Sequence, residues 1–281
     1  MAVEHVVVVG GGGLMGSGIA QVIASAGLLV TIVDVDEDAI ERGVRRIERG
    51  LEQAGDDRGE VRARISGSTS LEEAGAAADH VIESVIEEID TKTDVLRRLD
   101  AVCREDVIFA TNTSQFPISK LAAATGRPDR VIGSHWFNPP PAMKLIEVIR
   151  GIETSDATLQ ATLDLAQRYG KETIVCRKDT PGFVTSRLIA LFMIEAARIV
   201  EEGIADIEDV DKACKLGFGH AMGPLLTADL SGLDTVERVA DNLARNYGER
   251  FLLPQTVRAL VNAGHLGRKT GRGLRDYGEA R

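Results

Sequence analysis

Aromatic side chains and cysteines are both scarce in this sequence of 281 residues. Phe, Trp and Tyr make up 4% of the chain, which argues against a binding surface lined by aromatic rings, such as one for sugars or nucleic acid. The cysteines lie far apart, are odd in number and include no Cys-x-x-Cys pair. This pattern predicts buried free thiols rather than a disulfide framework or a zinc cluster, and no metal site is expected. The cysteines are Cys103, Cys176 and Cys214.

Clustered positive charge is also lacking, because 33 Lys and Arg face 43 Asp and Glu and the formal net charge is −10. A phosphate backbone needs clustered basic residues, so no nucleic-acid partner is expected. The N-terminal residues carry no basic segment, and the apolar run that follows, Val6–Val9, is too short for a signal peptide or a membrane span. We therefore expect a cytoplasmic protein that is not inserted in a membrane.

Short β-branched runs alternate with amphipathic stretches over the first two thirds of the chain. This alternation predicts a mostly parallel sheet that is covered on both faces by helices. The predicted strands are 6–9, 29–33, one near 65, 80–85, 107–110, 131–134 and 145–149. The predicted helices are 15–26, 37–53 and 91–103, and residues 56–59 are expected to end the second of them.

The pattern changes after Thr180, where Pro181 and Gly182 indicate a domain boundary. Beyond it the sequence predicts only helices, at 183–203, 207–216, 224–246 and 254–263. The chain length fits one larger domain and a smaller partner. We expect two domains, an α/β domain over residues 1–180 and an all-α domain over residues 181–281.

A run of four glycines follows the first predicted strand and leads into the first predicted helix. Gly11, Gly13 and Gly16 form a G-x-G-x-x-G motif, although the run allows a shift of one residue. Such glycines permit a tight turn and a close approach of the backbone to a pyrophosphate, which the N-terminus of the following helix attracts. The loop, including Leu14 and Met15, is therefore predicted to bind a dinucleotide in a Rossmann-type, doubly wound domain.

Asp34 ends the second predicted strand at the spacing expected for the acidic residue that binds a ribose hydroxyl. A carboxylate there repels a 2′-phosphate, and the residues after it, Val35 to Asp38, supply no cation for one. The predicted cofactor is therefore NAD rather than NADP. The alternative is a glycine-rich turn beside a surface aspartate.

His135 is the leading candidate for the base that an alcohol-oxidising nicotinamide enzyme needs. It follows the 131–134 strand, at the edge where open parallel sheets bind ligands. If the chain folds back around the prolines at 139–141, His135 and Glu147 face each other, since both are equally distant from Pro141. A carboxylate among Ile146, Val148 and Ile149 is costly to bury alone, and an imidazole would satisfy it. The alternative is a structural histidine and an exposed edge glutamate.

Thr111, Asn112, Thr113 and Ser114 follow the 107–110 strand and therefore lie at the same edge of the predicted sheet. Their hydroxyl and amide groups could bind a ligand carbonyl. An equally natural interpretation is a turn whose polar side chains cap a helix.

Together these segments resemble the L-3-hydroxyacyl-CoA dehydrogenase family, and 3-hydroxybutyryl-CoA dehydrogenases in particular. The resemblance runs essentially from end to end of the chain, and the order and spacing of its motifs make it specific. It rests on GGGLMGSGIAQ at 11–21, ATNTS at 110–114, HWFNPPPAMKL at 135–145, DTPGF at 179–183, KLGFGH at 215–220, MGP at 222–224, GLDT at 232–235 and LGRKTGRG at 266–273.

The resemblance implies NAD as cofactor, an acyl-CoA substrate and a role for four residues in catalysis. His135 would be the general base for the 3-hydroxyl proton, and Glu147 would orient it. Ser114 would bind the substrate oxygen, and Asn138 would help to position the reacting carbonyl and the cofactor.

The resemblance also implies cofactor contacts outside the glycine loop and an assembly. Glu87 and Lys92 match family positions on the ribose and nicotinamide side of the cofactor, and Lys269 matches a lysine near it. The helical domain would close over the acyl end of the substrate and form most of a homodimer interface.

Three departures from the family pattern affect substrate choice more than reaction type. Ser186 stands where the family usually has Asn near the catalytic site, the turn at His220 lacks a common proline, and residues 273–276 read GLRD in place of a usual Gly-Phe-Tyr.

Four arginines at helical spacing could bind coenzyme A phosphates, although a solvated helix face is favoured: Arg42, Arg45, Arg46 and Arg49. The alternatives to this activity are a dehydrogenase of a non-thioester hydroxy acid and a non-catalytic NAD-binding protein.

Overall fold

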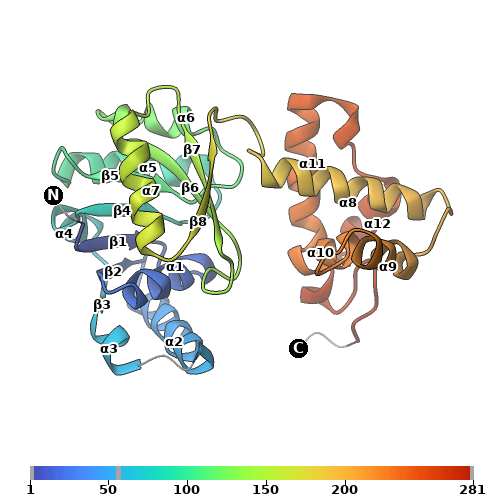
Figure 1. Cartoon of the computed structure of the whole chain (residues 1–281), viewed down its shortest axis with the longest axis horizontal. Helices are drawn as coiled ribbons and strands as arrows, with labels where there is room; N and C mark the ends of the chain where they lie inside the picture. The colour runs from blue at the N-terminus through green and yellow to red at the C-terminus, as the bar shows by residue number, and fades with distance from the viewer. Residues whose placement is uncertain (1–2, 55–57, 279–281) are drawn as a thin grey trace. The chain divides into compact units, whose positions relative to one another are not determined.

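The computed structural model describes residues 3–54 and 58–278, and the chain divides into two compact units, Met1–Thr180 and Pro181–Arg281 (Figure 1). The first unit is an α/β structure and the second is helical. Each unit has its own apolar core.

Within the described residues, eight strands of the first unit form one sheet in the order β3-β2-β1-β4-β5-β6-β7-β8. The strands from β3 to β6 pair in parallel, β7 runs antiparallel to β6, and β8 pairs in parallel with β7. The predicted mostly parallel, doubly wound sheet is thus confirmed. The strands are β1 His5–Val9, β2 Leu29–Val33, β3 Ile65–Ser68, β4 His80–Glu83, β5 Ile108–Thr111, β6 Val131–Trp136, β7 Leu145–Arg150 and β8 Glu172–Cys176.

Helices cover both faces of this sheet, as the burial of successive strand residues shows. Val6 and Val8 pack in one core cluster with Ile19 and Leu165, while Val7, which points to the opposite face, is fully buried as well. A strand that is apolar at every position therefore fits only between two layers of helices. The helices are α1 Leu14–Ser25, α2 Glu37–Ala54, α3 Arg58–Ala63, α4 Leu71–Ala76, α5 Ile89–Val102, α6 Ile118–Ala122 and α7 Asp156–Arg168, with a 3₁₀ turn η1 at Pro128–Arg130.

The second unit packs its helices around a core that includes Leu225, Leu233, Ala240 and Phe251. Its elements are α8 Thr185–Glu201, α9 Ile207–Gly217, α10 Pro224–Ser231, α11 Leu233–Tyr247 and α12 Gln255–Asn262, with 3₁₀ turns η2 Glu249–Phe251 and η3 Arg268–Thr270. The prediction of one helix over 224–246 is wrong. Gly232, with φ +90°, ends α10 and precedes α11, and this backbone conformation cannot continue a helix.

Other differences from the sequence-based prediction lie between and after the predicted strands. The short helices α4 and α6, the helix α7 and the edge strand β8 were not predicted, and β6 continues two residues beyond the predicted end at Ser134. Residues 56–57 of the predicted break lie outside the described residues, whereas residues 58–59 begin α3. Strand β8 alternates only weakly, since Thr173 and Ile174 are half-buried and Val175 is exposed.

All three cysteines are buried thiols that form no disulfide within the described residues, as the sequence predicted. Burial raises the pKa of the Cys103 thiol to about 11. Along residues 3–54 and 58–278, no helix combines the length and the apolar character that crossing a membrane requires.

Candidate active site

The carboxyl ends of the parallel strands gather the predicted site residues at one edge of the sheet. Val9 of β1 lies opposite Val33 of β2 and Glu83 of β4, and Glu83 lies opposite Thr111 of β5. The chain leaves each of these strands at the same level, so the loops that follow them are neighbours. This edge is where open α/β sheets bind their ligands.

The glycine-rich loop joins β1 to α1 and needs glycine for two separate reasons. Gly10 has φ +81°, and a side chain there would lie 2.4 Å from the Ser84 carbonyl oxygen. A Cβ on Gly16 would lie 2.2 Å from the Gly10 carbonyl oxygen, so only glycine lets the first turn of α1 pack against the loop. The left-handed turn thus falls at Gly10, while Gly16 has the packing role that the motif predicts for its last glycine.

The first turn of α1 is suited to an anionic group. Its N-cap is Gly13, so no side chain accepts hydrogen bonds from the first N–H groups, and the first turn holds no acidic residue. Leu14 and Met15 begin the helix, and Leu14 is exposed. The uncapped N–H groups and the helix dipole fit the pyrophosphate of a dinucleotide.

Asp34 lies beside this loop at the end of β2. Its Oδ2 accepts a hydrogen bond from the Gly12 N–H at 2.8 Å, and its Oδ1 accepts one from the Val35 N–H at 2.8 Å. Arg46 of α2 donates to the Gly12 carbonyl, so it does not belong to the solvated face that was predicted for the arginines, whereas Arg45 is exposed and pairs with Glu41. These contacts hold the loop and the aspartate together as one unit.

His135 and Glu147 lie opposite each other in the antiparallel β6–β7 hairpin. The His135 Nδ1 is 2.6 Å from the Glu147 Oε2. The carboxylate is fully buried and the imidazole is 11% exposed, so the ring covers the acid and is itself reached from outside. A short contact with a buried carboxylate fixes the tautomer and the orientation of an imidazole. The predicted pairing across the hairpin is confirmed.

The loop that connects β6 and β7 carries the remaining residue of this segment, Asn138. Asn138 is exposed and is joined to Pro139 by a cis peptide bond. The Lys171 Nζ donates to the Pro140 and Met143 carbonyls, both at 2.7 Å, which ties the proline loop to the start of β8. The His135 ring also contacts the Phe137 ring, with a centroid distance of 4.8 Å.

Ser114 lies in the turn between β5 and α6, and Glu87 organises this turn. The Glu87 Oε1 accepts hydrogen bonds from the Thr113 hydroxyl at 2.7 Å and from the Ser114 and Gln115 N–H groups at 2.9 and 3.2 Å. The Ser114 hydroxyl lies 3.3 Å from the same oxygen. Burial opposes ionisation of Glu87, but Lys92 and these donors outweigh it, so the pKa of Glu87 lies below its ordinary value.

Lys92 of α5 is fully buried and lies between two carboxylates. Its Nζ is 2.9 Å from the Glu83 Oε1 and 3.1 Å from the Glu87 Oε2. Burial would lower the pKa of Lys92, but Glu83 and Glu87 raise it, so the side chain is an ammonium held inside the protein. The family resemblance implied Glu87 and Lys92 as cofactor contacts, and in the structure the two side chains pair with each other.

Sequence reasoning missed Glu83, and it named Asn112 only as one member of a polar cluster. Glu83 is a fully buried carboxylate that follows the apolar residues Val81 and Ile82 at the end of β4, and Glu147 likewise lies next to apolar strand residues. Asn112 donates to the Ser84 hydroxyl and accepts from the Trp136 N–H, so it links the ends of β4, β5 and β6. In the 111–114 cluster, Asn112 and Thr113 thus build the loop, and Ser114 is half-buried.

Two predicted residues belong to the helical unit. The Lys269 Nζ pairs with both oxygens of Asp234, at 2.6 and 2.7 Å. Ser186 lies in the first turn of α8.

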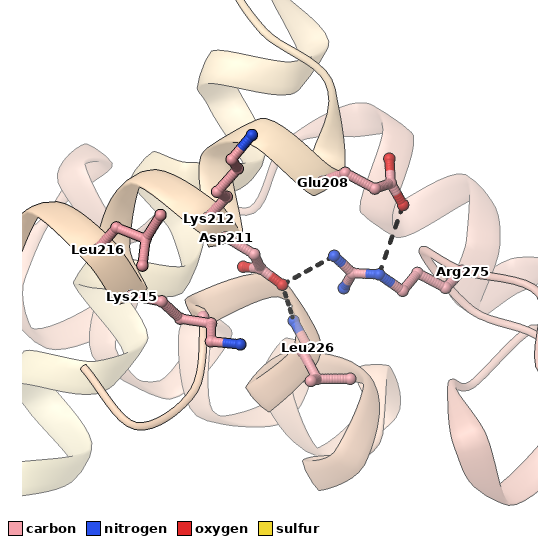
Figure 2. A pocket seen from close by; sticks show the side chains of 8 residues that line it. Glu208, Asp211, Lys212, Lys215, Leu216, Leu226 and Arg275 are labelled. Carbon is pink, nitrogen blue, oxygen red and sulfur yellow. Dashed lines mark hydrogen bonds and ion pairs between the residues drawn. The ribbon is translucent and has the colours of Figure 1, made fainter. Parts of the chain in front are cut away.

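The helical unit also contains a pocket of about 340 Å³ between α9, α10 and the C-terminal segment (Figure 2). In it the Arg275 guanidinium pairs with Asp211, whose carboxylate also accepts from the Leu226 N–H at the start of α10 (Figure 2). Among the described residues, the lining of this pocket includes none of the predicted catalytic or cofactor-binding residues. It is a separate feature of the second unit.

Comparison with protein families gives a match for each unit. Residues 5–180 match the model described as 3-hydroxyacyl-CoA dehydrogenase, NAD binding domain. Residues 182–277 match the model described as 3-hydroxyacyl-CoA dehydrogenase, C-terminal domain.

Individual relatives match over nearly the whole chain. A probable 3-hydroxybutyryl-CoA dehydrogenase of Bacillus subtilis is 44% identical, with 97% of each chain covered. The mitochondrial hydroxyacyl-coenzyme A dehydrogenase of Homo sapiens is 39% identical, with 98% of this chain and 91% of the human one covered. The crystal structure of (S)-3-hydroxybutyryl-CoA dehydrogenase PaaH1 from Ralstonia eutropha is 41% identical and superposes with a TM-score of 0.94, covering 99% of this chain and 100% of the other.

Proposed function

Because the chain belongs to the 3-hydroxyacyl-CoA dehydrogenase family, with the NAD-binding domain of that family as its first unit, we propose that it interconverts a (S)-3-hydroxyacyl-CoA and the corresponding 3-ketoacyl-CoA. A short-chain substrate of the 3-hydroxybutyryl-CoA type is proposed, since relatives at 44% and 41% identity bear that name. The observation that carries the proposal is the His135–Glu147 pair at the carboxyl edge of the sheet.

His135 is the general base in this proposal. Its Nδ1 faces the Glu147 carboxylate, so the neutral ring that donates from Nδ1 has its lone pair on Nε2. Nε2 would take the proton of the 3-hydroxyl during oxidation and return it during reduction. The buried negative charge of Glu147 stabilises the imidazolium that forms, which is the role of an orienting acid in a catalytic dyad.

Ser114 and Asn138 are proposed to hold the substrate oxygen that changes between hydroxyl and carbonyl. Ser114 is half-buried, and its backbone is fixed by Glu87. Asn138 follows the strand that carries His135, within the same β6–β7 connection. Hydrogen-bond donors that are already fixed when charge develops on an oxygen contribute most to such a reaction.

NAD supplies the hydride acceptor, and the glycine loop, Asp34 and Glu87 are proposed to bind it. The uncapped first turn of α1 suits the pyrophosphate, with Gly11, Gly13, Leu14, Met15 and Gly16 around it. Asp34, which is half-buried beside Gly12, would accept hydrogen bonds from the adenosine ribose. Lys92 is proposed to act on the cofactor through Glu87, and Lys269 to lie near the cofactor, as in the family.

The assembly and the cellular location are proposals as well. We propose a homodimer that forms through the helical unit, where Leu188 of α8 and Leu216 and Phe218 of α9 and its C-cap are 64%, 78% and 70% exposed. Large exposed apolar side chains are typical of association surfaces. A cytoplasmic location remains the prediction made from the sequence.

The decisive experiment follows NADH oxidation with acetoacetyl-CoA, with free acetoacetate and NADPH as controls. The proposal requires turnover with the thioester, little with the free acid, and a preference for NADH. Turnover of free acetoacetate without turnover of the thioester would identify a non-thioester dehydrogenase instead. NADH binding without turnover of any of these compounds would support a non-catalytic NAD-binding protein.

A further inference from the structure

A chain of buried charges runs from the sheet to the turn that carries Ser114. It begins at Glu83, which is fully buried and has partners on both carboxylate oxygens. The Glu83 Oε1 accepts from the Val85 N–H at 2.8 Å and from the Lys92 ammonium at 2.9 Å, and Oε2 accepts from the Thr111 hydroxyl at 2.6 Å. Glu83 is thus fixed to the ends of β4 and β5 at once.

Lys92 connects Glu83 to Glu87 by pairing with both carboxylates. Its ammonium bridges Glu83 and Glu87, and the far oxygen of Glu87 receives the donors of residues 113–115. Glu87 lies in the segment between β4 and α5, outside regular secondary structure. A carboxylate on such a segment keeps one orientation only if its partners are fixed, and Lys92 can be fixed because Glu83 neutralises and binds it inside the protein.

The chain of three groups carries one cation and two anions, all but Glu87 fully buried. Buried ionic groups contribute little net stability compared with an apolar core, so stability alone does not explain them. The three groups connect the end of β4 with the turn that carries Ser114, at the carboxyl edge of the sheet.

We infer that Glu83 is a positioning residue: through Lys92 it holds Glu87 in the orientation that fixes Ser114, and so sets the placement of the oxygen-binding hydroxyl and of the cofactor side of the site. This inference deepens the proposed dehydrogenase function and rests on it. Glu83 contacts neither the substrate nor the cofactor in this proposal. It acts by fixing Glu87 and Ser114, which are proposed to contact them.

The test compares the Glu83→Gln protein with the unaltered protein. Glutamine keeps the shape of the side chain but removes its charge. The Lys92 ammonium should then move toward Glu87 and pull the Glu87 carboxylate away from its hydrogen-bond donors in residues 113–115. We expect kcat to fall about 10-fold to 100-fold, as for a displacement of about 1 Å in an active site, with the acetoacetyl-CoA KM nearly unchanged. Amide hydrogen exchange at Ser114 and Gln115, whose N–H groups bond to Glu87, should become faster.

Two further variants separate positioning from general damage. In a Glu87→Gln background, Glu83→Gln should lower kcat no further, because the path through Glu87 is already broken. Asp100→Asn is the matched control. Asp100 lies on α5, like Lys92, and pairs with Arg127. The substitution therefore weakens a contact of the same helix without affecting Glu87. Its kcat and its Ser114 exchange should match those of the unaltered protein.

Unchanged kcat and exchange in Glu83→Gln, or effects that simply add in the double variant, would overturn the inference. If Glu83→Gln does not fold, Thr111→Val removes only the hydroxyl that orients Glu83 and should shift both readouts in the same direction by less. The exchange experiment needs no substrate. A protein inactive on every hydroxyacyl thioester would therefore refute the proposed function while the exchange rates still decide the role of Glu83.

Discussion

His135 and Glu147 occupy directly opposed positions of one antiparallel hairpin, and their side chains meet at 2.6 Å. Opposed residues in an antiparallel pair project to the same face of the sheet, so the register alone brings the two side chains together. The carboxylate needs the imidazole as a partner because it is fully buried. The imidazole in turn receives a fixed tautomer.

His135→Gln should lower turnover with acetoacetyl-CoA about 10²–10⁴-fold, the usual contribution of a positioned base. NADH affinity, measured by fluorescence, should stay nearly unchanged, because the residue lies outside the glycine loop. Glu147→Gln should lower turnover less, since the ring remains and only its orientation and charge stabilisation are weakened. Intact turnover in His135→Gln would rule out the proposed base.

Asp34→Ala should weaken the preference for NADH over NADPH about tenfold in kcat/KM, because the carboxylate that repels a 2′-phosphate is gone. The measurement is kcat/KM with each cofactor at saturating acetoacetyl-CoA. Asp36→Ala is the matched control: it removes a nearby carboxylate that caps the Ala39 N–H at the start of α2. Equal shifts in both variants would indicate a general charge effect and contradict the specific role of Asp34.

His80 should make the protein less stable in mild acid. Burial on β4 lowers its pKa from 6.5 to about 4, so between these values the unfolded chain binds a proton that the folded chain does not. Stability therefore falls as the pH drops through this window, by about 2 kcal/mol between pH 7 and pH 5. Urea titrations measure the free energy of unfolding at both pH values. Between pH 7 and pH 5 it should fall by about 2 kcal/mol less in His80→Leu than in the unaltered protein. Parallel pH profiles for both proteins would count against this assignment.

Leu188→Arg should convert the proposed dimer to a monomer, because it places a charge among the exposed apolar side chains of the helical unit. Sedimentation velocity at several concentrations measures the change. Ile152→Arg is the control, since Ile152 is 86% exposed on the first unit and should not affect association. A monomeric unaltered protein, or a dimer in Leu188→Arg, would refute the proposed interface.

The sequence was most informative where one rule acted alone. Continuous β-branched runs predicted the buried parallel strands, and the symmetry about Pro141 predicted that His135 and Glu147 meet. The argument that a buried carboxylate needs a partner was applied to Glu147 and not to Glu83, although both end up fully buried. The partner of Glu147 is His135 on the neighbouring strand β6. The partner of Glu83 is Lys92, and no local sequence pattern reveals that this lysine is buried.

Other features could not be predicted because tertiary contacts decide them. The α10–α11 boundary depends on one glycine in a helical pattern, and Gly232 is recognised as a break only by its backbone conformation. Edge strand β8 is only partly buried, so it lacks the apolar pattern that marked the central strands. The buried position of Lys92 follows from the folding of α5 over two carboxylates, not from its own sequence neighbours.

The β6–β7 hairpin has a consequence for how such proteins diversify. Residues 131–150 carry both the proposed base, His135, and its carboxylate partner, Glu147. Recombination that exchanges the helical unit, or insertions in the loops after β2 or β5, would leave this segment whole. The proposed acid–base pair would thus be inherited as one short continuous segment, while the residues proposed to bind the substrate oxygen and the cofactor come from other parts of the chain.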